Sequence, residues 1–292
     1  MSYNSYPIYG LPGNPYFCAS TEETMKRYLL YISILCLAFG LSGCELIEYH
    51  PYEVRINYRN INAENIERIE TACAGKEKIR FVWMGDTQRW YDETEDFVRH
   101  VNARTDIDFV MHGGDISDFG LQREFEWIHE DMRRLRVPYV ALIGNHDLLG
   151  NGLYVYERMY GPLNFSFLAG HTKFVCLNTN ALEFDYSHPV PDFEYILGEC
   201  ADQTPAVRQT VVAMHANPFG DQFNNNVARP FQAYIKRLPN LRFCLHAHAH
   251  SLMENDYFND GIVYYGCEAM KRRSYMVFTI TPEEYEYEVV YY

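Results

Sequence analysis

From residue 79 onward the chain repeats one pattern: a short apolar run, then a polar cluster, then a stretch with helical periodicity. Each apolar run is rich in residues that favour strands, which is typical of strands buried on both faces. The runs occupy residues 79–84, 108–111, 138–143, 174–177, 209–214 and 241–245. Strands that alternate with helices predict an α/β fold built in layers.

The helical periodicity is clearest after the second apolar run, where four apolar residues are spaced three, four and three positions apart and so share one helix face. They are Phe125, Ile128, Met132 and Leu135. Similar helices are expected within residues 95–101 and 230–238. Near the C-terminus, residues 285–289 alternate apolar and polar side chains, which predicts a half-exposed strand.

One domain is expected over residues 79–292, because no repeat or linker divides this region. The chain has 292 residues, of which 48% are hydrophobic, and this is enough for one sizeable core. Residues 44–78 are interpreted as a tether and a short opening segment, since they show only a weak alternation.

The N-terminal region has the pattern of an export signal. Lys26 and Arg27 precede 13 uncharged, mostly apolar residues, 28–40, and then the sequence Leu-Ser-Gly-Cys that ends at Cys44. A bilayer-spanning helix needs ~20 apolar residues, so this run is too short to span but fits a signal peptide. The alternative is a buried apolar helix followed by a chance cysteine.

The Leu-Ser-Gly-Cys ending resembles the bacterial lipobox. This resemblance implies a signal peptide over residues 25–43, with Cys44 as the lipidated first residue of the mature chain. Residues 1–24 are then an upstream extension that is not native, and Met25 is the better start. The expected location is the bacterial cell envelope, with the membrane as a partner through a lipid anchor.

The formal net charge of −14 argues against a nucleic-acid partner, because an acidic surface repels a polyanion unless a basic stripe compensates. The densest basic cluster after the signal is Lys271-Arg272-Arg273, and three cations are weak evidence for a polynucleotide groove.

Polar clusters follow five of the predicted strands, at the strand ends where open α/β sheets place their ligand sites. The clusters are Gly85-Asp86-Thr87-Gln88, Gly114-Asp115-Ile116-Ser117-Asp118, Gly144-Asn145-His146-Asp147, Met214-His215-Ala216-Asn217-Pro218 and His246-Ala247-His248-Ala249-His250. They offer carboxylate, amide and imidazole ligands without a thiolate, a set suited to Mn²⁺, Fe or Zn²⁺ rather than to a cysteine-rich zinc site. The preceding glycines are expected to let the backbone turn sharply.

Each cluster alone has an ordinary explanation. Gly-Asp is a common turn, His215 could be a hydrogen-bonded core residue, and alternating histidines on one strand face could be a polar surface. The evidence lies in the ordered set, because five such clusters at successive strand ends are hard to produce by chance.

The set resembles the calcineurin-like metallophosphoesterase superfamily, whose pattern is Asp-x-His, Gly-Asp, Gly-Asn-His-(Asp/Glu), His and Gly-His-x-His. The resemblance covers residues 79–292. It implies two packed mixed β-sheets flanked by helices, in a four-layer αββα sandwich. It also implies hydrolysis of a small phosphate ester, either a monoester or a diester, by a hydroxide that bridges two divalent metal ions.

The resemblance also implies a role for each matching residue. The ligands of one metal would be Asp86, Gln88, Asp115 and His250. The ligands of the other would be Asp115, Asn145, His215 and His248, so that Asp115 bridges both ions. His146 would remain off the metals and stabilise or protonate the leaving oxygen, while Asp147 would orient His146.

Three positions depart from the family pattern. Gln88 stands where histidine is usual, and its weaker amide ligand implies a looser site or a preference for a harder ion such as Mn²⁺ or Ca²⁺. Ala247 replaces a glycine, which matters only if the backbone there needs a positive φ. His246 is an extra imidazole that either supports the ligands from behind or is simply buried.

The segment Asp118-Phe119-Gly120 lacks the Arg-Gly pair of protein Ser/Thr phosphatases, so protein phosphatase activity is not expected.

Two other functions remain open at this point. One is a binding lipoprotein that keeps the fold but has lost turnover through changes such as Gln88, and the other is a nuclease of the same fold. The intact Asn145, His146 and His215 favour catalysis over binding alone. The loops at residues 148–157, 180–192 and 219–229 are expected to form the outer pocket, where aromatic side chains either stack on a base or sugar or pack as ordinary loop residues. They include Tyr154, Tyr156, Phe184, Tyr186 and Phe223.

Overall fold

A computed structural model describes residues 16–42, 53–182, 189–202 and 204–292. The chain forms two compact units, Met1–Glu53 and Val54–Tyr292. The described part of the first unit is helix α1 (Tyr16–Ser42), which contains the whole apolar run of the expected signal peptide. Among the described residues, none of the helices combines the length and apolarity needed to cross a bilayer. Cys44 lies outside the described residues.

The second unit contains two mixed sheets, and the first has five strands in the order β11-β10-β1-β2-β3. The parallel strands are β1 (Ile79–Met84), β2 (Phe109–His112) and β3 (Tyr139–Ala141). Two antiparallel strands complete the sheet, β10 (Ser274–Ile280) and β11 (Tyr285–Tyr291). Strand β11 has mostly exposed or half-exposed side chains, which confirms the half-exposed strand expected near the C-terminus.

The second sheet has six strands in the order β4-β5-β6-β7-β9-β8. Its strands are β4 (Phe165–Ala169), β5 (Thr172–Leu177), β6 (Gln209–Met214), β7 (Leu241–His246), β8 (Met253–Asn255) and β9 (Val263–Gly266). Strands β5, β6, β7 and β9 run parallel, while β4 and β8 are antiparallel to their neighbours. The parallel strands β5 and β6 are buried along their whole length, as their apolar sequences predict.

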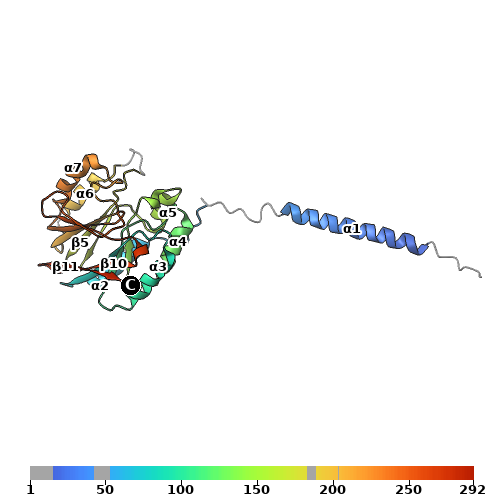
Figure 1. Ribbon diagram of the computed structural model, residues 1–292, viewed down its shortest axis with the longest axis horizontal. Coiled ribbons are helices and arrows are strands. Elements are labelled where there is room, and N and C mark those ends of the chain that lie inside the picture. Colours follow the sequence, from blue (N-terminus) through green and yellow to red (C-terminus); the bar gives the residue numbers. More distant parts are fainter. Residues whose placement is uncertain (1–15, 43–52, 183–188, 203) are drawn as a thin grey trace, which may run out of the picture. The chain divides into compact units, whose positions relative to one another are not determined.

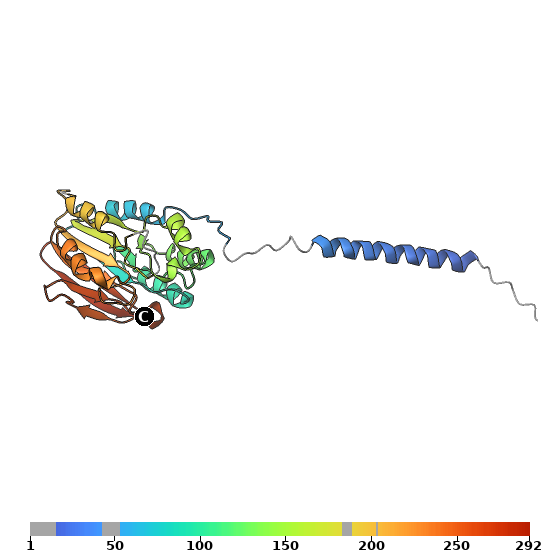
Figure 2. The ribbon, with the colours of Figure 1, turned by 90° about the horizontal axis from the view of Figure 1, so that it is seen from above.

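Helices cover the outer faces of both sheets (Figures 1 and 2). The helices on these faces are α3 (Tyr91–Asn102), α4 (Gln122–Met132), α5 (Gly152–Met159), α6 (Phe193–Ala201) and α7 (Ala228–Ile235), while α2 (Ile61–Cys73) packs against the edge strands β3 and β4. Short 3₁₀ turns lie at η1 (His146–Leu148), η2 (Asn225–Val227) and η3 (Met270–Arg272). Helices α3, α4 and α7 confirm the expected helical stretches.

Three apolar clusters define the layers. Phe81, Phe109, Phe174 and Phe243 belong to the cluster that joins residues of both sheets. A second cluster joins the first sheet to α3, α4 and α5, and a third joins the second sheet to α6 and α7. Because each sheet buries one face against the other sheet and one face against helices, the architecture is the expected four-layer αββα sandwich.

The compact unit begins at Val54, ahead of the domain start expected at residue 79. Helix α2 buries residues spaced four apart, and of these Ile69 and Cys73 join the core between the sheets. The Asn62 side chain donates to the Ala141 carbonyl and accepts from the Ala141 amide, both at 2.9 Å. This helix was missed because its buried face includes the polar Asn62 and Asn65 beside the apolar residues.

Candidate metal centre

The five polar clusters converge at the carboxyl ends of strands from both sheets. Strands β1, β2 and β3 lead into Asp86, Asp115 and Asn145, while β6 and β7 lead into His215 and His248. The potential ligand atoms form two groups, and within each group they all lie within 4.8 Å of one another. One group is Asp115, His215 and His248, and the other is Asp86, Asp115 and His250. Asp115 belongs to both groups, as expected for a residue that bridges two ions.

The hydrogen bonds of His215 leave its other ring nitrogen ready to bind a cation. Nδ1 donates to the Gly113 carbonyl at 2.8 Å, so the lone pair is on Nε2. Nε2 lies 3.1 Å from Asn145 Oδ1 and 3.3 Å from Asp115 Oδ1. Burial lowers the pKa of His215, which keeps the ring neutral. Three potential ligand atoms thus face one another, an arrangement that fits a metal ion.

Asp86 gives the second sign that this site suits a cation. Its side chain is fully buried, and Oδ1 lies 3.1 Å from His250 Nε2. Its other oxygen, Oδ2, is buried without a hydrogen-bond partner among the described residues. An unsatisfied buried acceptor costs about 1–3 kcal/mol, so it is seldom kept without a ligand. The carboxylate, amide and imidazole set of both groups therefore fits divalent metal ions.

The two buried carboxylates also shift the titration of their neighbours. Burial, and then the charge of Asp86, raises the pKa of Asp115 to about 7. Burial alone would raise the pKa of Asp86 too, but the hydrogen bond from His250 and the nearby His215 lower it. The hydrogen bond to Asp86 raises the pKa of His250. A site that gathers this much negative charge attracts cations.

Five of the expected ligands have a left-handed backbone, which is uncommon for residues other than glycine. They are Asp86 (φ 53°), Gln88 (34°), Asp115 (56°), His248 (62°) and His250 (53°). Such strain gathers at functional sites, where the surrounding structure holds it in place. Here the loops hold one another, since the amide of Asp86 donates to Gly114 and the amide of Gln88 donates to Asp115.

The glycines of the clusters allow the chain to turn, and they also allow neighbouring loops to approach one another closely. Gly114 has φ +97°, as a sharp turn requires. Gly144 has no positive φ, but a Cβ there would lie 2.1 Å from the Asp115 amide nitrogen. Any side chain at position 144 would therefore push the Asp115 carboxylate out of place.

His146 lies beside the cluster and belongs to neither ligand group among the described residues. Its backbone amide donates to Asp115 Oδ1 at 2.9 Å, and its side chain is 34% exposed. Nδ1 lies 2.7 Å from the Asp118 carbonyl and donates to it, so Nε2 is the ring atom that can exchange a proton with a substrate. The Asp118 carboxylate lies 3.7 Å from Nδ1 and is held by Arg89 at 2.7 Å.

The expected role of Asp147 as the residue that orients His146 is wrong. Its buried carboxylate accepts hydrogen bonds from the amides of Gly144, Ile116 and Ser117 and from the Ser117 hydroxyl. Burial and the charge of Asp115 raise its pKa to about 7. Asp147 therefore ties the loop after β2 to the loop after β3, and Asp118 orients His146 instead.

The three departures from the family pattern have clear structural outcomes. Gln88 lies at the site, where its amide nitrogen donates to Asp115 Oδ2 at 2.9 Å. Ala247 has no positive φ and packs beside Gly85 and Gly113, so the side chain is tolerated. His246 is buried, its Nδ1 donates to the Ala247 carbonyl, and burial lowers its pKa to about 4. It is absent from both ligand groups among the described residues.

Sequence reasoning missed two supporting residues. Asp221 accepts a 2.6 Å hydrogen bond from His248 Nε2, which leaves the His248 lone pair on Nδ1. The fully buried His112 accepts from the Gly114 amide and contacts the Thr87 hydroxyl at 2.9 Å. Burial lowers the pKa of His112 to about 3, so it is a neutral spacer between loops. Asp221 could have been found from the sequence, because it is an acidic residue in a loop expected to form the outer pocket. His112 gave no such signal, because it is the last residue of the apolar strand β2.

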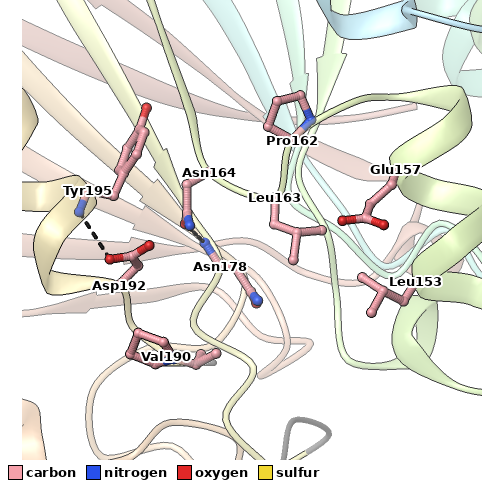
Figure 3. A pocket seen from close by; sticks show the side chains of 10 residues that line it. Leu153, Glu157, Pro162, Leu163, Asn164, Asn178, Val190, Asp192 and Tyr195 are labelled. Carbon is pink, nitrogen blue, oxygen red and sulfur yellow. Dashed lines mark hydrogen bonds between the residues drawn. The ribbon is translucent and has the colours of Figure 1, made fainter. Parts of the chain in front are cut away.

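Two cavities border the loops that were expected to form the outer pocket. One, of about 430 Å³, is lined by Asn217, Phe219, Gly220, Asp221, His248, Ala249, Met253 and Tyr257. The other, of about 350 Å³, lies between α5 and the start of α6. Figure 3 shows Leu153 and Glu157 on one side of this second cavity and Asp192 and Tyr195 on the other. None of the expected metal ligands lines the second cavity.

The aromatic residues that were expected in the outer pocket lie in different environments. Tyr156 is fully buried and donates to the Ala141 carbonyl, and Phe223 is also buried. Tyr154 is exposed but lines neither cavity. Phe184 and Tyr186 lie outside the described residues.

Comparisons with known proteins find relatives in sequence and in fold. A probable cyclic nucleotide phosphodiesterase of Moraxella catarrhalis (strain BBH18) is 23% identical over 174 residues, which are 53% of this chain and 58% of that protein. The purple acid phosphatase PPD1 from yellow lupin (Lupinus luteus) seeds has a similar structure, with a TM-score of 0.58, 13% identity, and coverage of 74% of this chain and 52% of that one. A dimetal phosphatase from Danio rerio gives a TM-score of 0.56 at 11% identity, over 72% of this chain and 98% of that one.

The chain thus spans little more than half the length of the bacterial relative and of the lupin enzyme. The structural likenesses show the shared fold. The sequence profile described as calcineurin-like phosphoesterase matches residues 79–252, which contain every residue expected to bind metal. Because this match spans more than half of the chain, the protein belongs to the calcineurin-like phosphoesterase family.

Proposed function

We propose that the domain formed by Val54–Tyr292 hydrolyses phosphate esters at a centre of two divalent cations. The observation that carries this proposal is the pair of acceptor clusters that share Asp115, with His146 beside them. The seven residues expected as ligands are Asp86, Gln88, Asp115, Asn145, His215, His248 and His250. A protein that only bound ligands would have no need of an imidazole held ready beside such a centre.

The division of labour follows from chemistry and geometry. When bound, two divalent cations supply positive charge for the phosphate oxygens and a water acidic enough to act as a hydroxide nucleophile at neutral pH. Asp115 would hold both ions at a fixed separation. His146, fixed by Asp118, would stabilise or protonate the leaving oxygen. Mn²⁺, Fe or Zn²⁺ fits the ligand set, and the amide of Gln88 weakens one of the two sites.

The ester is either a monoester or a diester. The name of the Moraxella relative, a probable cyclic nucleotide phosphodiesterase, favours a diester as the first choice of test substrate. The excess of acidic residues and the lack of a long basic stripe in the sequence support a small substrate over a polynucleotide.

The test combines metal content with turnover in the purified full chain. After dialysis against Mn²⁺ or Zn²⁺, we expect two ions per chain and hydrolysis of bis(p-nitrophenyl) phosphate or p-nitrophenyl phosphate. Asp115→Ala should lose both ions and the activity together, because both sites lose a ligand. Asn145→Ala should lose mainly one ion. A wild-type protein that binds two ions but hydrolyses neither ester would contradict catalysis and favour the binding protein.

For the first unit, we propose export followed by lipid attachment at Cys44. The support is the sequence, in which the Lys26-Arg27 start, the 13-residue apolar run and the Leu-Ser-Gly-Cys ending follow one another. Expressed in a bacterium, the protein should partition into detergent, and Cys44→Ala should remain unprocessed or be released. Wild-type protein found wholly in the cytosol with residues 25–43 attached would contradict this proposal.

A further inference from the structure

The cavity of about 430 Å³ lies directly beside the metal centre, because His248 and its partner Asp221 form part of its wall. A substrate whose phosphate binds at the centre would therefore place part of its organic group within reach of this cavity. The following inference rests on the proposed phosphoesterase function and concerns which organic group the cavity accepts.

Phe219 is the most unusual residue of the cavity wall. Its ring is 52% exposed, and its backbone has φ 70°, a conformation that is rare for a bulky side chain. The turn is tied in place: the Phe219 amide donates to Asn225 Oδ1 at 2.7 Å, and Asn225 Nδ2 donates to the Gly220 carbonyl at 2.8 Å. A strained backbone that holds an apolar ring partly in water contributes little to the core, and strain of this kind points to a functional role.

Tyr257 forms the adjoining part of the wall. Its ring centroid lies 6.0 Å from that of Phe219, and Phe219 also lies 5.3 Å from Phe258. The Tyr257 hydroxyl accepts a 3.0 Å hydrogen bond from Asn217, two residues beyond the expected ligand His215. The aromatic wall is thus anchored to the same loop as the metal centre, and its rings are held before any ligand arrives.

The charge of the cavity limits the ligand further. The described residues that line it include no lysine or arginine, and its ionised carboxylate is Asp221. A second phosphate group would meet a carboxylate there without a compensating cation. The cavity therefore fits an uncharged group, and Phe219, Tyr257 and Met253 make it an apolar one.

We infer that Phe219, supported by Tyr257, is a specificity-determining residue that stacks on a planar ring in the organic part of the substrate. The preferred esters are those of ring-bearing alcohols, such as nucleosides, rather than those of simple sugars or alkyl alcohols. Stacking of one base on an aromatic side chain corresponds to about 5- to 150-fold in affinity.

The test measures binding without turnover in the full chain loaded with Mn²⁺. The probes are the 5′-phosphonates of adenosine and of ribose, in which a CH₂ group replaces the ester oxygen so that neither is hydrolysed. By calorimetry, wild-type protein should bind the adenosine phosphonate about 5- to 150-fold more tightly than the ribose phosphonate. Phe219→Ala should remove most of this difference and leave the Kd of the ribose compound unchanged, while Phe219→Tyr should keep it.

Trp127→Ala is the matched control, because Trp127 is also half exposed but does not line the cavity. It should retain the preference for adenosine. Equal Kd values in the wild type, or a preference that survives in Phe219→Ala, would overturn the inference. A Phe219-dependent preference for adenosine in a protein that hydrolyses no ester would support the ring site and contradict the proposed catalysis. Hydrolysis without any preference for adenosine would support the proposed catalysis and contradict the ring site.

Discussion

Some residues at this site have a chemical role and others hold the loops in place, and the two kinds look alike in the sequence. His146 and Asp147 are neighbours in one motif, yet His146 is partly exposed beside the metal ligands, whereas Asp147 is buried and accepts hydrogen bonds from loop amides. The difference arises because the η1 turn that begins at His146 points successive side chains in different directions. Substitutions at these two positions should therefore have different consequences.

His146→Ala should keep both metal ions and near-normal substrate affinity while lowering kcat by ~10²–10⁴-fold, the usual contribution of a positioned acid. Esters with good leaving groups should suffer least, since they need little protonation. Metal content by mass spectrometry beside kcat on two aryl phosphates of different leaving-group pKa checks this. Loss of the metals, or full turnover on the poorer leaving group, would show that the assigned role is wrong.

Asp147→Ala should act on stability first. The amides of Gly144, Ile116 and Ser117 would remain buried without their acceptor, and each such donor costs about 1–3 kcal/mol. We expect the free energy of unfolding in urea to fall by about 3 kcal/mol or more, and Asp147→Asn is the milder variant if the alanine variant does not fold. Unchanged stability together with a large loss of kcat would restore the role of orienting His146.

Among the secondary-structure elements, α2 shows how a segment can look like a tether and still be part of the core. Its sequence is largely polar, but Ile69 and Cys73 are fully buried between the sheets. The Asn62 side chain pairs with both backbone groups of Ala141 at the edge strand β3, as a further strand would. The helix therefore completes the first sheet rather than linking it to something else.

Ile69→Ala should lower the free energy of unfolding by about 2–5 kcal/mol, the usual cost of emptying a buried aliphatic site. Ile66→Ala, one turn earlier on the less buried side of the helix, should cost less. Urea denaturation of both variants measures the difference. If α2 were only a tether, both substitutions would leave the unfolding midpoint unchanged, and a chain beginning at residue 79 would be as stable as one beginning at residue 54.

At the scale of the whole domain, the metal centre joins the two sheets. Its expected ligands follow β1, β2 and β3 of the first sheet and β6 and β7 of the second, so a bound ion would connect loops from both. Binding to the folded state alone raises its stability, by about 2.7 kcal/mol when the free ion is at 100 times its Kd. The centre is therefore expected to contribute to stability as well as to chemistry.

Adding Mn²⁺ or Zn²⁺ to metal-free protein should raise the Tm by about 5–10 °C, from that free energy and the usual response of a domain of this size. The shift should shrink as pH falls, because protons compete with the ion for His215 and the carboxylates. Calorimetric scans with and without metal measure it. Asp115→Ala is the control and should show no shift, while an equal shift in both proteins would place the bound ion elsewhere.

The sequence by itself determined the layered α/β class and the residue types at the strand ends, because strand periodicity and polar clusters are local properties of the chain. It also determined which residues are candidates for the two ligand groups, since parallel strands of a sheet bring their carboxyl ends to one edge. The family resemblance supplied the roles, and the shared position of Asp115 agrees with it.

Only the tertiary structure decided which polar groups face one another. Asp118 replaced Asp147 beside His146, Asp221 joined His248, and Phe219 rather than Tyr156 or Phe223 lines the cavity at the metal centre. These contacts join segments that are distant in the chain, and they depend on loop φ angles that no periodicity encodes. The start of the compact unit at Val54 was likewise decided by packing, because a helix whose buried face is partly polar is recognised only by the core that it completes.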